Sequence, residues 1–392
     1  MSAGLRIMML FNFKFFFTLA YLSLFKSKGT QARLTRKRIV FLLGSFLTFV
    51  PLQLIHGFFL LLDWVLFPGF RRVEVREPVF ILGNPRTGST HLLRVLARDE
   101  ETFAVAKLWE LVLAPSITQR KIVRGLGRLD QCFGSPLKRW IVAWQKHAFL
   151  EEGQYRRLRL EEPDEDELSL LTIFSAIHLV FAFPFWEAFH RYTCFDSEVS
   201  PAEKKRFMTF YKRCMQRTLY IYGPTKHFLS KTPANCGRVG TLCETFPDAK
   251  FIYTARNPLS MFPSTMSLFA YQCTHFSDLL EPYPFGEYLL ETTKHWYRYP
   301  IRKLEESANT YTVVKYKPLV QDLEQTVIGI YTTFSLQISQ TYNLVLKNEV
   351  RKARNYTSQH EYKLEDMGFT PEQIITEYQD VFEFFGFDNE GK

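Results

Sequence analysis

The sequence predicts an α/β protein in which a central parallel sheet, flanked by helices, follows N-terminal membrane helices. Short segments rich in β-branched and aromatic residues alternate with helical segments, as in parallel sheets that are covered on both faces. A glycine-bearing loop follows the first of these segments, and two long apolar segments precede it. The candidate strands are residues 79–82, 227–230, 250–254 and 311–316.

The two apolar segments predict an association with a membrane. Residues 5–25 are interrupted by Lys14, and residues 39–67 contain a single acid, Asp63. At helical rise the second segment reaches about 43 Å, more than a bilayer core of about 30 Å. Pro51 near its middle allows another solution, in which two half-length helices form a hairpin in one leaflet. A pair of core helices in a soluble protein is the third solution.

Basic residues flank the second apolar segment on both sides and leave its orientation open. Six Lys and Arg residues lie between 26 and 38, and three lie between 71 and 76. A true span would place the body on the lumenal, non-cytoplasmic side, whereas a hairpin would leave both flanks on the cytoplasmic face. We expect a membrane-associated region at residues 1–70 and a catalytic domain at residues 71–392.

The loop after the first strand has the pattern of a phosphate site. Residues 78–94 read PVFILGNPRTGSTHLLR, a strand, a loop and a helix start that together present N–H groups to an anion. Gly83 and Gly88 keep the Walker A spacing, but Ser89 stands where that motif needs lysine, and Arg86 carries the charge instead. A structural turn without ligand is the alternative. The candidate ligands are Pro85, Arg86, Thr87, Gly88, Ser89 and Thr90.

Two residues beyond the loop are candidates for a general base. His91 follows the loop directly, and Glu110 lies about twenty residues farther on among apolar neighbours. A lone histidine is more often structural, and a glutamate in an apolar context is the rarer event. The acidic run EEPDEDE at residues 161–167 is interpreted as the solvated start of a helix.

Two helix starts have the pattern of a capping box with proline at the first helical position. Ser200 precedes Pro201 and is followed three residues later by Glu203. Thr370 is followed in the same way by Gln373, and we expect it to open the last helix.

Three further segments supply side chains that could hold phosphate groups. Lys231 follows the second strand, at the edge where ligands bind in open parallel sheets, unless it is an ordinary strand-end lysine. Arg256 follows the third strand, and Ser264 lies about two helical turns beyond it, so the pair could bind a second phosphate. Arg351 opens a basic segment that would either close over a nucleotide or remain solvated.

The composition excludes several classes of protein. A hydrophobic content of 46% with 23% charged residues indicates a packed globule rather than a disordered chain. The formal net charge of +9 fits a membrane surface or an anionic ligand. The six cysteines lack a C-x-x-C pair, so we expect free thiols and no zinc site. The strand at 250–254 lacks the terminal acid that would hold Mg²⁺ beside a nucleoside triphosphate.

Together these motifs resemble the PAPS-dependent sulfotransferases, in particular the group with a P-R-(S/T)-G-(S/T)-T loop. The resemblance runs from about residue 72 to residue 387 and implies the sulfotransferase relative of the P-loop NTPase fold. It places Arg86 in the 5′-phosphosulfate loop, Lys231 at the transferring sulfuryl group, and Arg256 with Ser264 at the 3′-phosphate. Two more segments, 314–323 and 360–368, resemble family signatures, although Lys317 replaces the usual acid.

The resemblance implies a metal-independent enzyme that transfers a sulfuryl group from PAPS to a hydroxyl or amine acceptor. The histidine base of the cytosolic sulfotransferases has no counterpart, because Asn235 and Cys236 stand there. Other branches use a glutamate some twenty residues past the loop, and Glu110 fits that spacing. We therefore assign catalytic roles to Glu110, Lys231 and Arg86, and add Arg351 to the donor-binding residues.

The acceptor is predicted to be a small molecule or a lipid, with a membrane but no nucleic acid as partner. Residues 108–222, from which acceptor pockets are built, are rich in Phe, Trp and Leu, which suits an apolar or lipid-linked alcohol. Core packing is the alternative explanation of these side chains. A nucleotide or metabolite kinase and a catalytically silent membrane scaffold are the alternative functions.

Overall fold

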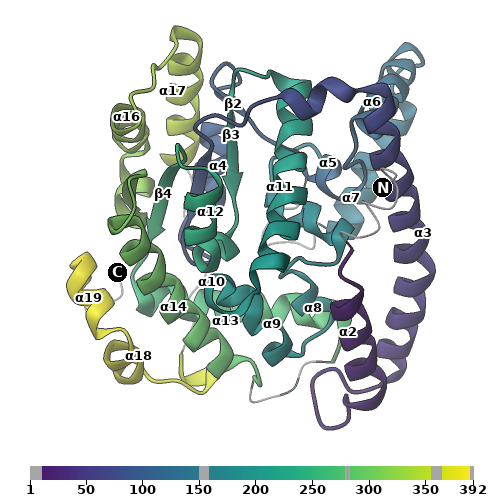
Figure 1. The fold of residues 1–392 in the computed structure, drawn as a ribbon. Coiled ribbons are helices and arrows are strands. Elements are labelled where there is room, and N and C mark those ends of the chain that lie inside the picture. Colours follow the sequence, from purple (N-terminus) through teal and green to yellow (C-terminus); the bar gives the residue numbers. More distant parts are fainter. Residues whose placement is uncertain (1–10, 150–158, 279, 281–282, 355–363, 389–392) are drawn as a thin grey trace.

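The computed structural model describes residues 11–149, 159–278, 280, 283–354 and 364–388. In this part of the chain, five parallel strands form one sheet in the order β2-β3-β1-β4-β5 (Figure 1). Four of them agree with the predicted segments to within one residue, which confirms the fold class. The prediction lacks β2, because a strand of two residues carries no periodic pattern. The strands are β1 (Val79–Leu82), β2 (Phe103–Ala104), β3 (His227–Lys231), β4 (Lys250–Ala255) and β5 (Thr310–Lys315).

The two faces of the sheet are buried in two separate cores. Along β1, Phe80 and Leu82 belong to the larger core, while Val79 and Ile81 point into the smaller one, as the alternation of side chains along a strand requires. The smaller core is closed by α4 (Ser89–Leu96), α15 (Tyr316–Gln321), α16 (Leu323–Thr333) and α17 (Gln340–Arg354).

The larger core is closed by most of the remaining helices. Because both sheet faces are covered, β1 and β4 are buried along almost their whole length rather than at alternate residues. The covering helices are α2 (Phe13–Phe25), α3 (Arg36–Leu66), η2 (Asp166–Ile173), α8 (Leu179–Ala182), α9 (Trp186–Thr193), α10 (Phe195–Glu198), α11 (Pro201–Tyr222), η3 (Pro233–Arg238), α12 (Val239–Thr245), α13 (Pro258–Phe276), α14 (Gly286–Glu305), α18 (Pro371–Glu377) and α19 (Gln379–Phe385).

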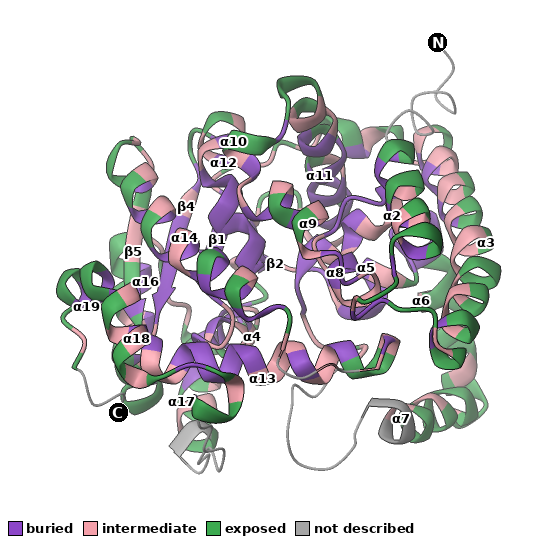
Figure 2. Cartoon of the chain, turned by 90° about the horizontal axis from the view of Figure 1, so that it is seen from below, coloured by how far each residue is buried: buried purple, intermediate pink, exposed green. Residues whose placement is uncertain are grey.

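Three helices and two short 3-10 turns complete the described chain. In both views α6 and α7 lie at the same edge of the molecule as α3 (Figures 1 and 2). These elements are α5 (Leu108–Val112), α6 (Ile117–Cys132), α7 (Pro136–Phe149), η1 (Pro68–Arg72) and η4 (Glu365–Met367).

The second apolar segment forms one continuous helix. Pro51 lies inside α3 and does not end it, so the predicted hairpin of two half-length helices is wrong. Among the described residues α3 is the helix long and apolar enough to cross a membrane, and 6% of its most apolar 18-residue stretch is buried. Phe15, Leu19 and Leu60 of α2 and α3 join the larger core, so these helices pack on the α/β body.

The predicted helix starts are present, but only one is capped as expected. The hydroxyl of Thr370 accepts a hydrogen bond from the Gln373 N–H at 3.2 Å, and α18 begins at Pro371. The α19 helix follows, so α18 is not the last one. Ser200 precedes α11 without a side-chain capping bond, and the Glu203 carboxylate contacts Asn12, Arg191 and Arg206 instead of the N-cap N–H. All six cysteines are free.

Candidate functional site

The predicted phosphate loop follows β1, at the point where the strand order of the sheet reverses. β1 pairs with β3 on one side and with β4 on the other, so the loop after β1 begins at the crevice where open parallel sheets bind ligands. Ile81 is in register with Lys231 of β3, and Leu82 is in register with Tyr253 of β4. The topology therefore brings the loop, Lys231 and the residues after β4 to one edge of the sheet.

Two glycines let the loop pass close to its neighbours. Gly83 has a φ of 127°, and a Cβ there would lie 2.3 Å from the carbonyl oxygen of Thr254. Gly88 caps α4 with a φ of 84°, and a Cβ there would lie 2.9 Å from the side chain of Leu319. Arg86 also has a left-handed φ of 66°, which costs energy in a residue with a side chain. The backbone is thus held in a fixed, compact turn at the N-terminus of α4.

Hydroxyl groups tie this turn to β4. The Thr87 hydroxyl donates to the carbonyl of Asn84 at 2.7 Å and lies 2.7 Å from the Thr254 hydroxyl. The Thr254 hydroxyl in turn donates to the carbonyl of Leu82 at 2.8 Å. Thr87 therefore serves the shape of the loop, and its hydroxyl is already used.

Arg86, Ser264 and Arg256, which are all predicted to bind the donor, lie close together. The Arg86 Nε donates to the Ser264 hydroxyl at 2.9 Å, although 178 residues separate them in the chain. The guanidinium of Arg256 donates to the Arg86 carbonyl at 3.0 Å and lies over the ring of Tyr316, 4.3 Å from its centroid. Two guanidinium groups and a hydroxyl thus gather beside the N-terminus of α4, a set that suits an anion with several phosphate oxygens.

Arg351 lies on α17, which also packs near α4. Its side chain is exposed, and the Tyr342 hydroxyl of the same helix donates to the Val95 carbonyl of α4 at 3.1 Å. Most of the basic segment that follows Arg351, and the start of the family signature at 360–368, lie outside the described residues. Arg351 stays a predicted ligand.

The ammonium group of Lys231 contacts the carboxylate of Glu165, a residue of the acidic run at 161–167. Its ammonium group lies 2.6 Å from Oε1 of Glu165, and both side chains are buried. The other oxygen, Oε2, lies 3.0 Å from Nε2 of His178. A basic, an acidic and an imidazole group therefore meet at the carboxyl end of β3.

The acidic run at 161–167 is not the solvated helix start that the sequence suggests. Asp164, Glu165, Asp166 and Glu167 are buried, because basic and hydroxyl groups from distant segments neutralise them. Glu167 pairs with the equally buried Arg238. The sequence contains one signal for this burial. Basic residues in apolar surroundings need buried acids as partners, and the acidic run can supply them.

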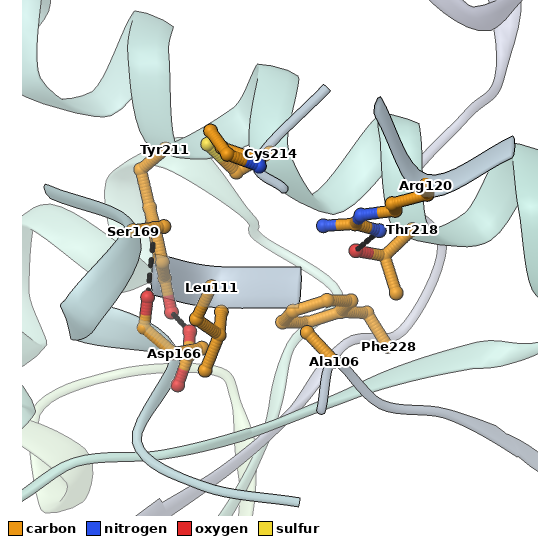
Figure 3. A pocket seen from close by; sticks show the side chains of 10 residues that line it. Ala106, Leu111, Arg120, Asp166, Ser169, Tyr211, Cys214, Thr218 and Phe228 are labelled. Carbon is orange, nitrogen blue, oxygen red and sulfur yellow. Dashed lines mark hydrogen bonds between the residues drawn. The ribbon is translucent and has the colours of Figure 1, made fainter. Parts of the chain in front are cut away.

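Asp166 anchors this run to β3. It accepts a hydrogen bond from the Tyr211 hydroxyl (Figure 3). It also accepts from the Ser230 hydroxyl at 2.9 Å and from the Lys231 N–H at 3.1 Å. Burial raises the pKa of Asp166, and these hydrogen bonds oppose the shift. The cavity beside it has about 10 Å³, room for about one water and too small for a substrate. Asp166 therefore positions the backbone of Lys231.

Glu110, the base predicted from spacing, sits in a different set of contacts. Its Oε1 accepts from Arg124 at 2.9 Å and from the Tyr222 hydroxyl at 2.8 Å, and its Oε2 accepts from the Lys107 N–H at 3.1 Å. These contacts tie α5 to α6 and α11. None of the three partners is a predicted donor-binding residue. The structure thus brings Arg86, Arg256, Ser264 and the loop together, and brings Lys231 to Glu165 rather than to Glu110.

Comparisons with known proteins agree with this arrangement. Residues 78–340 match the Sulfotransferase family. The chain is 25% identical over 321 residues to the omega-hydroxy-beta-dihydromenaquinone-9 sulfotransferases Stf3 of Mycobacterium bovis and Mycobacterium tuberculosis, covering 79% of this chain and 75% of each of theirs.

Two solved structures share the fold. Sulfotransferase STF9 from Mycobacterium avium superposes with a TM-score of 0.70 at 18% identity, over 87% of this chain and 85% of the other. Sulfotransferase STF1 from Mycobacterium tuberculosis H37Rv gives 0.64 at 21% identity, over 93% and 92%. The overall fold of this chain is therefore one that occurs in solved sulfotransferases.

Proposed function

The chain belongs to the sulfotransferase family, and from this premise we propose that it transfers the sulfuryl group of PAPS to the hydroxyl of a lipid-like acceptor. The observation that carries the proposal is the meeting, at one sheet edge, of a phosphate loop with the Lys231–Glu165 pair. One group of side chains can bind the donor, and the other can handle the proton and the leaving oxygen.

The donor fits the residues beside α4. The Gly83 and Gly88 turns let the loop pack closely on Thr254 and Leu319, and N–H groups at the start of α4 suit the 5′-phosphosulfate. Arg256 and Ser264, joined through Arg86, offer charge and a hydroxyl for the 3′-phosphate. PAPS would supply the activated sulfuryl group, and this chain would supply charge and orientation.

The proposed reaction forms one bond and breaks another at sulfur. The acceptor oxygen bonds to sulfur while the bond from sulfur to the 5′-phosphate oxygen breaks, and the electron pair leaves with adenosine 3′,5′-bisphosphate. Lys231 stabilises the charge that develops on the leaving oxygen, and Arg86 stabilises the sulfuryl oxygens. The acceptor proton passes to a carboxylate of the enzyme, so atoms and charge balance.

We favour Glu165 as that carboxylate over Glu110. Glu165 touches Lys231, whereas Glu110 contacts Arg124, Tyr222 and Lys107, none of which is a predicted donor-binding residue. A base has to lie within hydrogen-bond reach of the reacting hydroxyl, and Lys231 marks where the sulfuryl group would be. His178 on the far oxygen of Glu165 would orient the carboxylate.

The proposed acceptor is apolar for two reasons. The curated relatives named Stf3 act on a hydroxylated dihydromenaquinone, a lipid, according to their names. In this chain the ring of His178 lies against Phe181, 6.4 Å between centroids, and Phe181 packs on Phe269 at 4.9 Å. An aromatic wall thus starts beside the proposed base, where an apolar chain could lie.

The first test measures donor binding by calorimetry. Purified protein should bind adenosine 3′,5′-bisphosphate in the presence of EDTA, and Arg256→Ala should weaken binding by at least about tenfold because a charge-assisted phosphate contact is lost. Tight binding of ATP with Mg²⁺ but not of the bisphosphate nucleotide would overturn the proposal in favour of a kinase.

The second test separates the two carboxylates. With PAPS and long-chain alcohols as probes, Lys231→Ala and Glu165→Gln should lose about 100-fold or more in kcat while keeping affinity for the bisphosphate nucleotide. Glu110→Gln should retain most of kcat in the protein that folds. A Glu165→Gln enzyme with wild-type kcat, together with an inactive Glu110→Gln enzyme of normal stability, would return the role of base to Glu110.

A further inference from the structure

The outer surface of α3 is the largest feature that the proposed reaction leaves without a role. Arg38, His56 and Asp63 are buried against the body. Arg38 and His56 are about five helical turns apart, and His56 and Asp63 are about two turns apart. They therefore share one face of α3. On the opposite face, exposed apolar side chains follow one another along the whole helix: Val40, Leu43, Leu47, Leu54, Phe58 and Val65.

Polar contacts hold the inner face of α3 to the body from one end to the other. Near its start, Arg38 donates to the carbonyls of Ala182 and Phe276, at 2.6 and 3.2 Å. Near its end, Asp63 accepts from Arg217 at 2.9 Å, and from the N–H groups of Ile117 and Thr118, both at 2.9 Å.

The middle of the helix is held in the same way. The ring of His56 bridges the Val112 carbonyl, at 3.1 Å, and the Gln119 amide, at 3.0 Å.

This docking is incompatible with α3 as a membrane span. The anchored stretch from Arg38 to Asp63 measures about 38 Å, longer than a hydrocarbon core of about 30 Å. A span along this stretch would carry the body that it is bonded to into the lipid. The helix can meet a membrane only lengthwise, with its outer face towards the hydrocarbon and its inner face on the protein.

The apolar surface continues onto α6, which packs on α3, and onto α7, which packs on α6 (Figure 2). Trp140 and Trp144 on α7 are both exposed and one helical turn apart, and tryptophan favours the boundary between hydrocarbon and headgroups. Exposed apolar residues on these two helices are Ile122, Val123, Leu126, Leu129, Phe133, Leu137, Trp140, Val142 and Trp144.

The charges around this surface have one sign. In the segments 11–66 and 113–145, the two acids, Asp63 and Asp130, are buried or half-buried, and every exposed charged side chain is basic. Such a frame attracts anionic headgroups, by about 1 kcal/mol per basic residue near the surface. The exposed basic residues are Lys14, Lys26, Lys28, Arg33, Arg36, Lys37, Lys121, Arg128, Lys138 and Arg139.

We infer that the outer faces of α3, α6 and α7 form a membrane-docking surface that enters one leaflet of an anionic bilayer without crossing it. The apolar stripe supplies the buried contact, and the basic frame supplies attraction to the headgroups. The inference does not depend on the transfer chemistry, because it uses no residue of the phosphate loop or of the Lys231–Glu165 pair.

Vesicle flotation of the purified full-length protein tests this surface. The protein should float with vesicles of phosphatidylcholine and phosphatidylserine, and less with phosphatidylcholine alone. The triple variant Leu47→Gln, Leu54→Gln, Phe58→Gln, whose positions are 70%, 71% and 61% exposed, should bind at least about tenfold more weakly.

The matched control is Leu344→Gln on α17, which is 67% exposed on the other side of the molecule and should float as the wild type does. All variants should keep their affinity for adenosine 3′,5′-bisphosphate, so loss of flotation cannot be mistaken for loss of the donor site. Equal flotation of the triple variant and the wild type would overturn the inference, and so would a non-floating protein that dimerises through this face.

Sidedness separates lengthwise docking from a span. Short peptide tags at the N-terminus and the C-terminus, in protein bound to the outside of sealed vesicles, should both be open to protease. Protection of one tag while the other is cleaved would mean that the helix crosses the bilayer, and the inference would then be wrong.

Discussion

At Gly83 the phosphate loop passes so close to β4 that no side chain fits between them. The same loop places a left-handed φ on Arg86, which is tolerated because Thr87 and Thr254 fix the turn from both sides. Individual residues here are constrained by backbone geometry first and by charge second.

Gly83→Ala should disturb the donor site. The new Cβ would lie 2.3 Å from the Thr254 carbonyl oxygen, so the loop or β4 has to move, at a cost of about 1–3 kcal/mol in stability. Titration with adenosine 3′,5′-bisphosphate should show at least tenfold weaker binding, and urea unfolding should report the loss of stability. The control is Gly329→Ala in α16, where a Cβ meets no atom and helix propensity favours alanine. Normal nucleotide binding by Gly83→Ala would show that the loop is softer than its geometry indicates.

Asp166→Asn should change the pH dependence of stability. Burial raises the pKa of Asp166, so the folded protein keeps a proton that the unfolded chain releases above about pH 3.9. That residue's contribution to stability is therefore fully present at low pH and is lost as the pH rises through the folded-state pKa. Asparagine does not titrate, so the variant should gain stability relative to the wild type as the pH rises above about 4 in urea titrations.

The control for this comparison is Asp380→Asn. Arg298 lowers the pKa of Asp380, so its stabilising contribution is lost as the pH falls, and the variant should lose stability relative to the wild type as the pH rises at the acid end of the titration. Parallel curves for Asp166→Asn and the wild type would contradict the raised pKa.

Single elements were predictable where the chain carries a local pattern. The strand β1, the loop and the start of α4 lie within one stretch of the sequence, so their geometry could be predicted. The same holds for Arg256 and Ser264, which follow one strand. Glu165 could not be predicted, because its partner Lys231 is 66 residues away and only the fold joins them. Pro51 suggested a break that the structure does not have. The α3 helix packs on the body and stays continuous, where proline alone would favour a break.

Asp63→Ala should weaken the junction between α3 and α6. The carboxylate caps the first N–H groups of α6 and pairs with Arg217, which would be left buried without its main partner. The expected loss is about 3–5 kcal/mol in the free energy of unfolding, measured with urea in detergent solution. Ser116→Ala, which removes only the N-cap hydroxyl of the same helix, should cost about 1 kcal/mol. Similar losses for the two variants would mean that Asp63 acts only as a cap.

The molecule as a whole has a core to which its N-terminus contributes. The sequence suggests a boundary near residue 70, because hydropathy changes there. In the folded chain Phe15 lies against Phe189 and Tyr192, with ring centroids 5.2 and 5.4 Å apart. The change in hydropathy near residue 70 therefore does not separate two cores, because side chains of α2 and α3 belong to the larger core of the body.

A shortened chain that begins at Pro68 should therefore fail as an independent domain. It would expose the core surface covered by α2 and α3 and would leave Arg217 without Asp63. We expect aggregation, or unfolding at clearly lower urea concentration than the full chain, as followed by circular dichroism and size-exclusion chromatography. A monomeric shortened protein with the full chain's unfolding midpoint would instead support residues 71–392 as a separate catalytic domain.

The contact between Arg38 and Phe276 can form only after most of the chain has been synthesised. The 238 residues between them take about 12–48 s to synthesise at 5–20 residues per second. During that interval the Phe276 carbonyl that will receive Arg38 does not yet exist, although the Ala182 carbonyl is made earlier. The apolar stripe of α3 is complete from the start, whereas its polar face gains partners one by one. The nascent helix therefore presents its apolar face to its surroundings before it can pack on the α/β body.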